Sequence, residues 1–260
     1  PFMILAIDMG NSNIVIGGID KKRTYFVERV STNHGKTDLE YAVNIKDIMA
    51  IHNLPLSSIE GAIVSSVVPP LTEVLLSAVK KITGKRPLLV GSGMKTGLNI
   101  IMDNPKTVGS DLIVDAVAAL RDYPAPIIVI DMGTATTLSV IDKAGNYTGG
   151  IIFPGIRVSL DSLSSRAAQL PYIGLDNPAK IIGKNTIDCM KSGILYGNAA
   201  MIDGVIDRME EELGCSASLV ATGGLAPTVL PLCRHKIQYD DALLLKGLLI
   251  LYEKNRPAEK

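Results

Sequence analysis

The sequence predicts an α/β protein made of two related lobes, each a mixed sheet flanked by helices, with a cleft between the lobes. The tetrapeptide IDMG occurs twice, at 7–10 and at 130–133. Each copy ends an apolar run of strand length and is followed by turn-forming residues and a second apolar run. No low-complexity segment or Pro/Ser-rich linker separates the halves, so the repeat indicates a duplicated domain.

The first half begins with a strand, a tight turn and a second strand. The run 3–7 is continuously apolar, as in a strand buried on both faces, and 10–13 are turn formers. Thr37 and Glu40 form a capping-box pattern that starts a helix over 37–54. The other expected elements are strands at 23–30, 61–70 (stopped by two prolines) and 86–93, and helices at 71–84 and 109–124.

The second half restarts the strand-turn-strand signal at Ile127. A long helix is expected over 187–213 with Thr186 as its N-cap residue. The other expected elements are strands at 127–142 (a hairpin), 145–155 and 216–224, and a closing helix at 241–255. The join falls near 123–126, which predicts lobes at 1–123 and 124–260.

The composition of the chain argues against several classes of protein. Aromatic residues make up 4 %, Trp is absent and the formal net charge is zero, which argues against a nucleic-acid partner. The three cysteines form no C-x-x-C pair, which is typical of a reducing compartment. The apolar runs are strand-sized and no signal-peptide pattern opens the chain, so we expect a cytoplasmic protein without a membrane partner.

The repeated hairpins carry the chemistry. Asp8 and Asp131 each stand at the end of a buried strand, two positions before a glycine that permits close approach of a ligand to the backbone. The polar turns that follow, at 10–13 and 134–137, offer amide, hydroxyl and backbone donors that suit phosphate oxygens. Two such turns can hold one nucleotide while a carboxylate holds a cation. For one copy alone, an Asx-type turn is the simpler interpretation.

A third candidate is LVATGGLA at 219–226, where a strand runs into Gly223 and Gly224. A glycine pair suits close approach of a flat group such as adenine, and an ordinary strand-to-helix turn explains it equally well. The chain resembles the type III pantothenate kinases in a set of motifs that occur in the same order: DMGNSN, NPKTVGSD, DMGTATT, GGIIFPG and ATGGLA. This family belongs to the actin, hexokinase and heat-shock-chaperone superfamily of ATPases. The resemblance covers nearly the whole chain and implies actin-like (ribonuclease H-like) lobes.

The resemblance implies that ATP and pantothenate are the substrates and that 4′-phosphopantothenate, the first intermediate toward coenzyme A, is the product. Asp111 would be the general base toward the pantothenate hydroxyl. Asp8 would help to hold Mg²⁺, and Asp131 would hold a monovalent cation (K⁺ or NH₄⁺). The residues expected to contact ATP are Asp8, Gly10, Asn11, Ser12, Asn13, Thr134, Gly223 and Gly224.

The acceptor side is expected to comprise Met102, Gly109, Ser110, Asp111, Leu112 and Thr186, the last reaching the pocket of a neighbouring subunit. The family usually has G-A-D-R where this chain has Gly109–Leu112, and a tyrosine where it has Met102. Both departures concern pantothenate more than the nucleotide. Gly193, Gly197 and Gly204 lie on or near one stripe of the long helix and indicate a packing seam, which fits the homodimer that the family forms.

Two alternatives stay open at this stage. One is a non-catalytic, nucleotide-binding regulator that kept the hairpins and lost the acceptor site. The other is a superfamily kinase that phosphorylates a different hydroxyl compound, such as a sugar. Asp111 together with both hairpins favours an enzyme, whereas Met102 and Leu112 are the residues that a regulator would explain.

Overall fold

The computed structural model describes residues 2–167, 169–178 and 180–256. These form two compact units: unit 1 comprises the residues up to 98, 103–118 and those from 242 onward, and unit 2 comprises 99–102 and 119–241. The closing helix α7 (Leu243–Asn255) therefore belongs to unit 1, whereas a boundary at 123/124 assigns it to the second lobe. The reason is packing: Leu245 occupies the space that a side chain at Gly17 would need.

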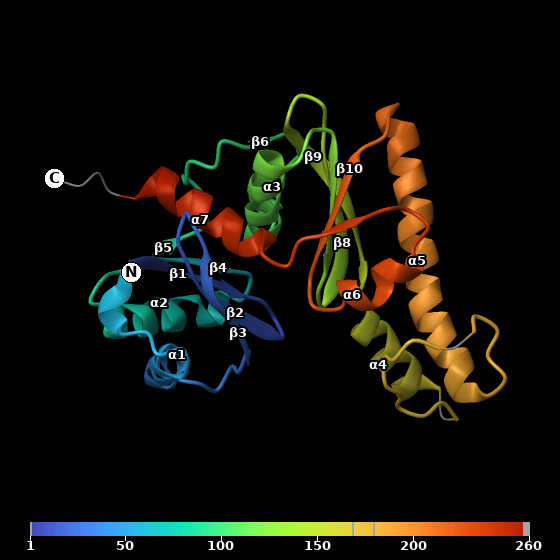
Figure 1. Ribbon diagram of the computed structural model, residues 1–260, viewed down its shortest axis with the longest axis horizontal. Coiled ribbons are helices and arrows are strands. Elements are labelled where there is room, and N and C mark those ends of the chain that lie inside the picture. Colours follow the sequence, from blue (N-terminus) through green and yellow to red (C-terminus); the bar gives the residue numbers. More distant parts are fainter. Residues whose placement is uncertain (1, 168, 179, 257–260) are drawn as a thin grey trace. The chain divides into compact units, whose positions relative to one another are not determined.

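Unit 1 is built on a five-stranded mixed sheet of order β3-β2-β1-β4-β5 (Figure 1). The first three strands form an antiparallel meander, and β4 runs parallel to β1. Strand β1 is buried along nearly its whole length, as its unbroken apolar run predicts. The strands are β1 (Met3–Met9), β2 (Asn13–Ile19), β3 (Thr24–Ser31), β4 (Ile59–Ser66) and β5 (Leu88–Leu89).

Helices α1 (Asp38–Ile51) and α2 (Pro69–Thr83) pack together and share a core with this sheet. The predicted capping box is confirmed: the Glu40 amide donates to Thr37, and the Glu40 carboxylate accepts from the Thr37 amide. Gly84 ends α2 in the left-handed region, as expected for a glycine C-cap. Helix α3 (Ser110–Asp122) begins in unit 1. The short 3₁₀ turns are η1 (Leu56–Ser58) and η2 (Pro105–Thr107).

Unit 2 repeats the same topology in a six-stranded sheet of order β11-β10-β7-β8-β9-β6. Strands β7, β8 and β9 form the antiparallel meander, and β10 runs parallel to β7 just as β4 runs parallel to β1. The strands are β6 (Asn99–Ile100), β7 (Ile127–Met132), β8 (Ala135–Ile141), β9 (Asn146–Pro154), β10 (Ser218–Thr222) and β11 (Gln238–Tyr239). Two mixed sheets that open with the same meander confirm the predicted fold class.

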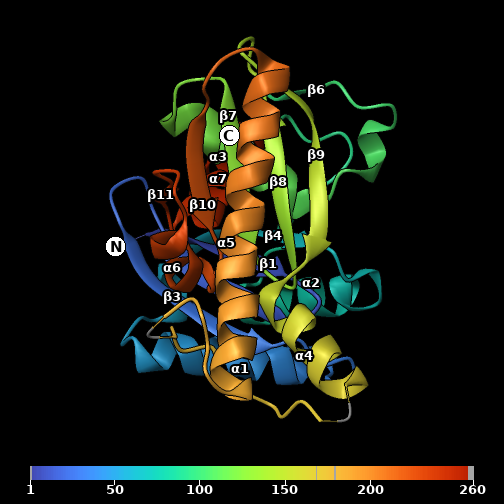
Figure 2. The same cartoon turned by 90° about the vertical axis from the view of Figure 1, so that its right-hand side faces the viewer.

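The long helix α5 (Thr186–Leu213) runs along one face of this sheet (Figure 2). Its N-cap residue is Asn185, whose side-chain oxygen accepts from the Asp188 amide, so the expectation of Thr186 as N-cap is wrong by one position. Asn185 is the last residue with extended backbone before the helix, so its side-chain oxygen, and not that of the helical Thr186, reaches back to the Asp188 amide. The remaining helices are α4 (Ile156–Arg166), α6 (Ala226–Val229) and η3 (Leu230–Leu232). No helix among the described residues is long and apolar enough to span a bilayer.

Candidate active site

The first hairpin turn is held by backbone contacts and by one threonine. The Gly10 amide donates to the Asn13 carbonyl at 2.9 Å, which closes the turn. The Thr32 hydroxyl donates to the Gly10 carbonyl at 2.6 Å, and the Thr32 amide donates to the Ser12 carbonyl at 3.0 Å. The side chains of Asn11, Ser12 and Asn13 are exposed beside the half-buried Asp8. The turn is therefore a fixed frame with outward-facing donors, and sequence reasoning missed Thr32 because it follows β3, about twenty positions beyond the turn that it braces.

The second hairpin turn, which follows Asp131, is shorter than the first, and Gly155 lies directly against it. The Gly133 amide donates to the Ala135 carbonyl, and the Gly155 amide donates to the Thr134 carbonyl, both at 3.0 Å. A side chain at Gly155 would overlap the carbonyl oxygens of Gly133 and Thr134. Gly155 therefore allows the end of β9 to lie directly against the turn, which leaves Thr134 exposed.

The strand register surrounds Asp131 with hydroxyl-bearing residues. Asp131 pairs with Thr137 of β8 on one side and with Thr222 of β10 on the other. Paired residues on neighbouring strands project to the same face of a sheet. The Thr137 hydroxyl is buried and has no hydrogen-bond partner among the described residues. A buried hydroxyl without a partner beside a carboxylate is the donor set that a bound cation would satisfy.

Gly223 has a structural role in unit 2. Its φ is 99°, and a side chain there would collide with the backbone of Met132. The Tyr239 hydroxyl lies 3.5 Å from the Gly223 carbonyl, while Gly224 is exposed. Packing against Met132 thus accounts for glycine at 223, and nucleotide contact by this pair stays a prediction.

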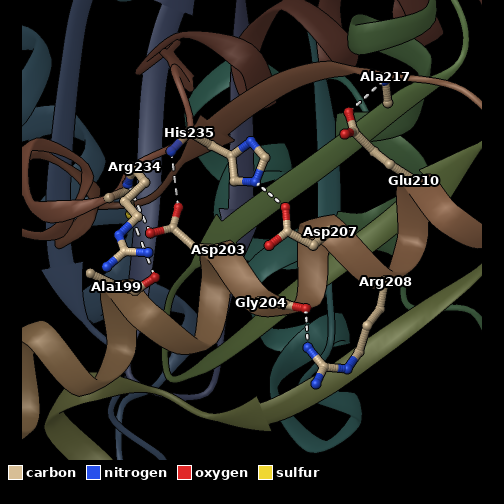
Figure 3. A network of polar contacts seen from close by, with 10 residues as sticks. Ala199, Asp203, Gly204, Asp207, Arg208, Glu210, Ala217, Arg234 and His235 are labelled. Carbon is tan, nitrogen blue, oxygen red and sulfur yellow. Dashed lines mark hydrogen bonds and ion pairs between the residues drawn. The ribbon is translucent and has the colours of Figure 1, made fainter.

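A polar network on α5 fixes the segment that leads into β11 (Figure 3). Asp203 accepts from the amides of Arg234 at 2.8 Å and His235 at 3.1 Å. Asp207, one turn along the helix, lies 2.8 Å from His235 Nε2. Two carboxylates of one helix therefore anchor the residues just before Tyr239, whose hydroxyl faces the glycine turn.

The acceptor residue Asp111 lies in the first turn of α3, in the same unit as Asp8. Its Oδ1 accepts from the Leu112 amide at 2.9 Å. Burial raises the pKa of Asp111, and backbone amide donors oppose that rise. A side chain at Gly109 would overlap the Asp111 carboxylate, so Gly109 leaves the space that this carboxylate occupies. A half-buried carboxylate with a raised pKa is the kind of group that accepts protons in catalysis.

The other predicted acceptor residues divide between the units. Leu112 follows Asp111 in unit 1 and is half-buried. Met102 lies in unit 2, also half-buried, next to the Cα of Gly149. Thr186 is exposed at the first position of α5 in unit 2. Unit 1 thus brings together Asp8, the 10–13 turn and 109–112, and unit 2 brings together Asp131, Thr134, Gly223 and Gly224.

A cavity of about 660 Å³ in unit 1 is not this site. It is lined by residues of the β2–β3 turn, by Phe2 and Ile4, and by Glu253 of α7. These surround the start of β1, whereas the candidate turn follows its other end. No group of three His, Cys, Asp or Glu side chains in the described ranges is arranged to enclose a metal ion. A cation here would therefore depend on one or two carboxylates plus ligand oxygens.

Comparison with known proteins gives a consistent result. The family model of type III pantothenate kinase matches residues 4–208. The chain is 44 % identical to the type III pantothenate kinase of Exiguobacterium sp. over 98 % of this chain and all of that protein. It is also 44 % identical to the one from Moorella thermoacetica, over 97 % of this chain and all of that protein.

Solved structures support the fold. A protein from Campylobacter jejuni, described as a conserved putative Baf family transcriptional activator, has a TM-score of 0.59 at 19 % identity, covering 96 % of this chain and 98 % of that one. A putative 2-dehydro-3-deoxygalactonokinase from Sinorhizobium meliloti has a TM-score of 0.57 at 13 % identity, covering 99 % and 98 %. The sequence relatives and the family model together establish that the chain belongs to the type III pantothenate kinase family.

Proposed function

We propose that this protein transfers the γ-phosphoryl group of ATP to the primary hydroxyl of pantothenate, giving 4′-phosphopantothenate and ADP. The observation that carries the proposal is the half-buried Asp111, in the same unit as the strand-end Asp8 and its donor-rich turn. The relatives named as pantothenate kinases span the full chain and support the choice of substrate.

Asp111 acts as the base toward the attacking hydroxyl. The hydroxyl proton moves to a carboxylate oxygen as the alcohol oxygen attacks the γ-phosphorus, and ADP leaves with the electrons of the broken P–O bond. Because charge on the moving phosphoryl group dominates the barrier, the base mainly orients the alcohol. The raised pKa of Asp111 makes the carboxylate a better proton acceptor than an exposed aspartate.

Each hairpin offers what a nucleotide and its cations need. The turns at 10–13 and at 134–137 would donate to phosphate oxygens, and the exposed Gly224 would accept the adenosine. Asp8 fits Mg²⁺, which keeps several waters and phosphate oxygens and needs only one or two carboxylates. Asp131 fits a monovalent cation such as K⁺ or NH₄⁺, because the Thr137 hydroxyl on the paired strand has no partner within the described part of the chain. When bound, these cations neutralise the charge that builds up on the phosphoryl oxygens.

The pantothenate side has an apolar character in this chain. Met102 and Leu112 are half-buried and carry no hydrogen-bonding group suited to a carboxylate. Neither side chain therefore offers a donor to the carboxylate of pantothenate. The presence of Met102 and Leu112 at these positions also favours the second candidate function, a nucleotide-binding regulator that phosphorylates no substrate.

The exposed face of α5 supports a homodimer. Gly193 and Gly197 are exposed, and a Cβ added at either would have no atom of the described residues within 4 Å beyond its own stretch of helix backbone. The cost of glycine inside a helix, about 1 kcal/mol each against alanine, is offset when a second subunit packs there. Thr186, on the same helix, would then reach the partner's pocket. Light scattering tests this assembly: Gly197→Glu should yield monomers, whereas Glu211→Lys, at an exposed position farther along α5, should not.

The cytoplasm is the compartment that we propose, because it supplies ATP and keeps thiols reduced. Cys189 is exposed and no disulfide joins the three cysteines. Soluble substrates require neither a membrane nor a nucleic acid as partner. Fractionation of cells that express the tagged protein, with a membrane marker, checks this location.

A coupled ADP-release assay in the presence of Mg²⁺ and K⁺ tests the main proposal. Turnover that requires pantothenate and falls at least about a hundredfold in Asp111→Asn supports it. ATP binding without turnover would select the regulator. Turnover only with another hydroxyl compound would select a superfamily kinase of different specificity. The 4′-phosphate position is verified by mass spectrometry and phosphorus NMR of the product.

A further inference from the structure

Two serine hydroxyls join the end of a central strand to the start of the helix that carries Asp111. Ser65 Oγ and Ser110 Oγ lie 3.0 Å apart, and Ser110 Oγ also lies 3.2 Å from the Ser66 carbonyl oxygen. Ser65 is fully buried, so its hydroxyl needs a hydrogen-bond partner inside the protein. The contact spans 45 positions of sequence and lies wholly within unit 1.

Ser65 also occupies the rung of the sheet next to Asp8. In the parallel β1–β4 pair, Asp8 is the register partner of Ser65, and Met9 is the partner of Ser66. Ser110 directly precedes Asp111 in the chain. Asp8 and Asp111 are therefore linked in three steps: the β1–β4 pairing joins Asp8 to Ser65, a hydroxyl contact joins Ser65 to Ser110, and the peptide bond joins Ser110 to Asp111.

The start of α3 lacks the usual side-chain anchor. Gly109 precedes the first helical residue and has no side chain to accept from a free amide. Asp111 itself accepts from the Leu112 amide, so the carboxylate serves as its own cap. Without a lateral hydrogen bond, this first turn would be free to fray, and the carboxylate would move with it.

We propose that the Ser65–Ser110 hydroxyl pair is a positioning device, which fixes the Asp111 carboxylate relative to the strand end that carries Asp8. The inference rests on the proposed function, because it assigns Asp111 the acceptor role. In this proposal Ser110, expected above on the acceptor side, acts through Asp111, because its hydroxyl is engaged with Ser65 and the Ser66 carbonyl. Loss of the pair lowers the fraction of enzyme in which the base meets the hydroxyl, so kcat falls while nucleotide binding is unchanged.

Steady-state kinetics of four variants test the device. Ser110→Ala should lower kcat about tenfold and change the KM for ATP less than about twofold, because misplacement of a reacting group by a fraction of an ångström costs rate rather than affinity. Ser110→Thr keeps a hydroxyl and should recover most of the rate. Ser65→Ala should match Ser110→Ala, and the double variant should be no slower than either single one, since both remove the same bond.

Thr72→Val is the matched control. The Thr72 hydroxyl bonds to Ser66 Oγ at 2.9 Å and to the Val68 carbonyl at 3.1 Å, in the first turn of α2, and makes no hydrogen bond to the Ser65–Ser110 pair or to Asp111. Its removal should lower the melting temperature about as much as Ser110→Ala does and leave kcat within about twofold of the parent. Equal rate losses in Thr72→Val and Ser110→Ala would overturn the inference, because general destabilisation would then explain both.

Amide hydrogen exchange separates this inference from the proposed function. Exchange at the first turn of α3 should be at least about tenfold faster in Ser110→Ala than in Thr72→Val, with no substrate required. If the parent protein does not phosphorylate pantothenate, the proposed function fails. Faster amide exchange in Ser110→Ala would still show that the Ser65–Ser110 pair holds the first turn of α3. Unchanged exchange, or faster exchange with unchanged kcat in an active enzyme, would overturn it.

Discussion

Asp8 and Asp131 occupy equivalent strand ends in the two units but have different register partners on the neighbouring strands. We call each aspartate with its register partners a rung of the sheet. In unit 2, Asp131 stands between Thr137 and Thr222, so a hydroxyl-bearing residue flanks it on both sides. In unit 1, Asp8 stands between Ser65 and the apolar Val15. Among its register partners Asp8 thus has one hydroxyl, which contacts Ser110, whereas Asp131 has two.

Under the proposed function, this difference predicts that one duplicated hairpin serves two kinds of cation. Mg²⁺ keeps most of its water and is held through few carboxylates and phosphate oxygens, which suits the sparse Asp8 rung. A monovalent cation is weakly hydrated and needs several protein oxygens, which suits the Asp131 rung. The shared topology places both carboxylates at strand ends, and the neighbouring residues determine what each can bind.

The largest expected effect separates the two carboxylates. Asp8→Asn should lower kcat/KM on the order of 100-fold or more, and the loss should be reduced by raising Mg²⁺, because the charge that holds the divalent ion is gone. Asp131→Asn should instead shift the K⁺ concentration that is needed for half-maximal activity. Titrations of each variant with MgCl₂ and with KCl measure this. The two-cation interpretation is wrong if both variants respond to the same ion.

The two turns also differ in how they tolerate an added methyl group. Gly155→Ala should lower the free energy of unfolding by roughly 2–3 kcal/mol, because its Cβ would overlap the backbone of 133–134. Gly10→Ala is the control: its Cβ would approach only the Asn13 carbonyl, at 3.1 Å, so a loss below about 1 kcal/mol is expected. Urea denaturation compares them. Equal losses would show that the second turn is not packed as described.

Sequence reasoning reached the strand ends but not the contacts that brace them. The repeated apolar-run–Asp–x–Gly pattern placed Asp8 and Asp131, and Thr37 with Glu40 placed the start of α1, because such signals are local. The Thr32 brace, the Gly155 packing and the Ser65–Ser110 pair join residues far apart in the chain. No local pattern encodes them. The placement of α7 in unit 1 was missed for the same reason.

A smaller effect sharpens the description of the Asp131 rung. Thr137→Val replaces a buried hydroxyl, which no described residue pairs with, by a methyl group of similar size, so the free energy of unfolding should change by less than about 1 kcal/mol. The affinity for the activating monovalent cation should fall about tenfold, since one oxygen ligand is lost. Activity against KCl concentration measures it, with Val15→Thr in unit 1 as the reciprocal variant. An unchanged KCl response in Thr137→Val would remove Thr137 from the cation site.

The smallest effect concerns the pH dependence of stability at Asp111. Burial raises the pKa of this carboxyl in the folded protein above its unfolded value, so the folded state binds the proton more tightly. The contribution of Asp111 to stability is therefore fully present below the unfolded pKa and is lost as the pH rises through the folded pKa. At a pH above the folded pKa the ionised, half-buried carboxylate is destabilising, so Asp111→Asn should there raise the melting temperature by about 1–3 °C while it lowers turnover at least about a hundredfold. The gain should vanish at a pH below the ordinary range of aspartate, where both proteins carry a neutral group. A gain that persists in acid would mean that repacking around residue 111, rather than desolvation of its charge, is the cause.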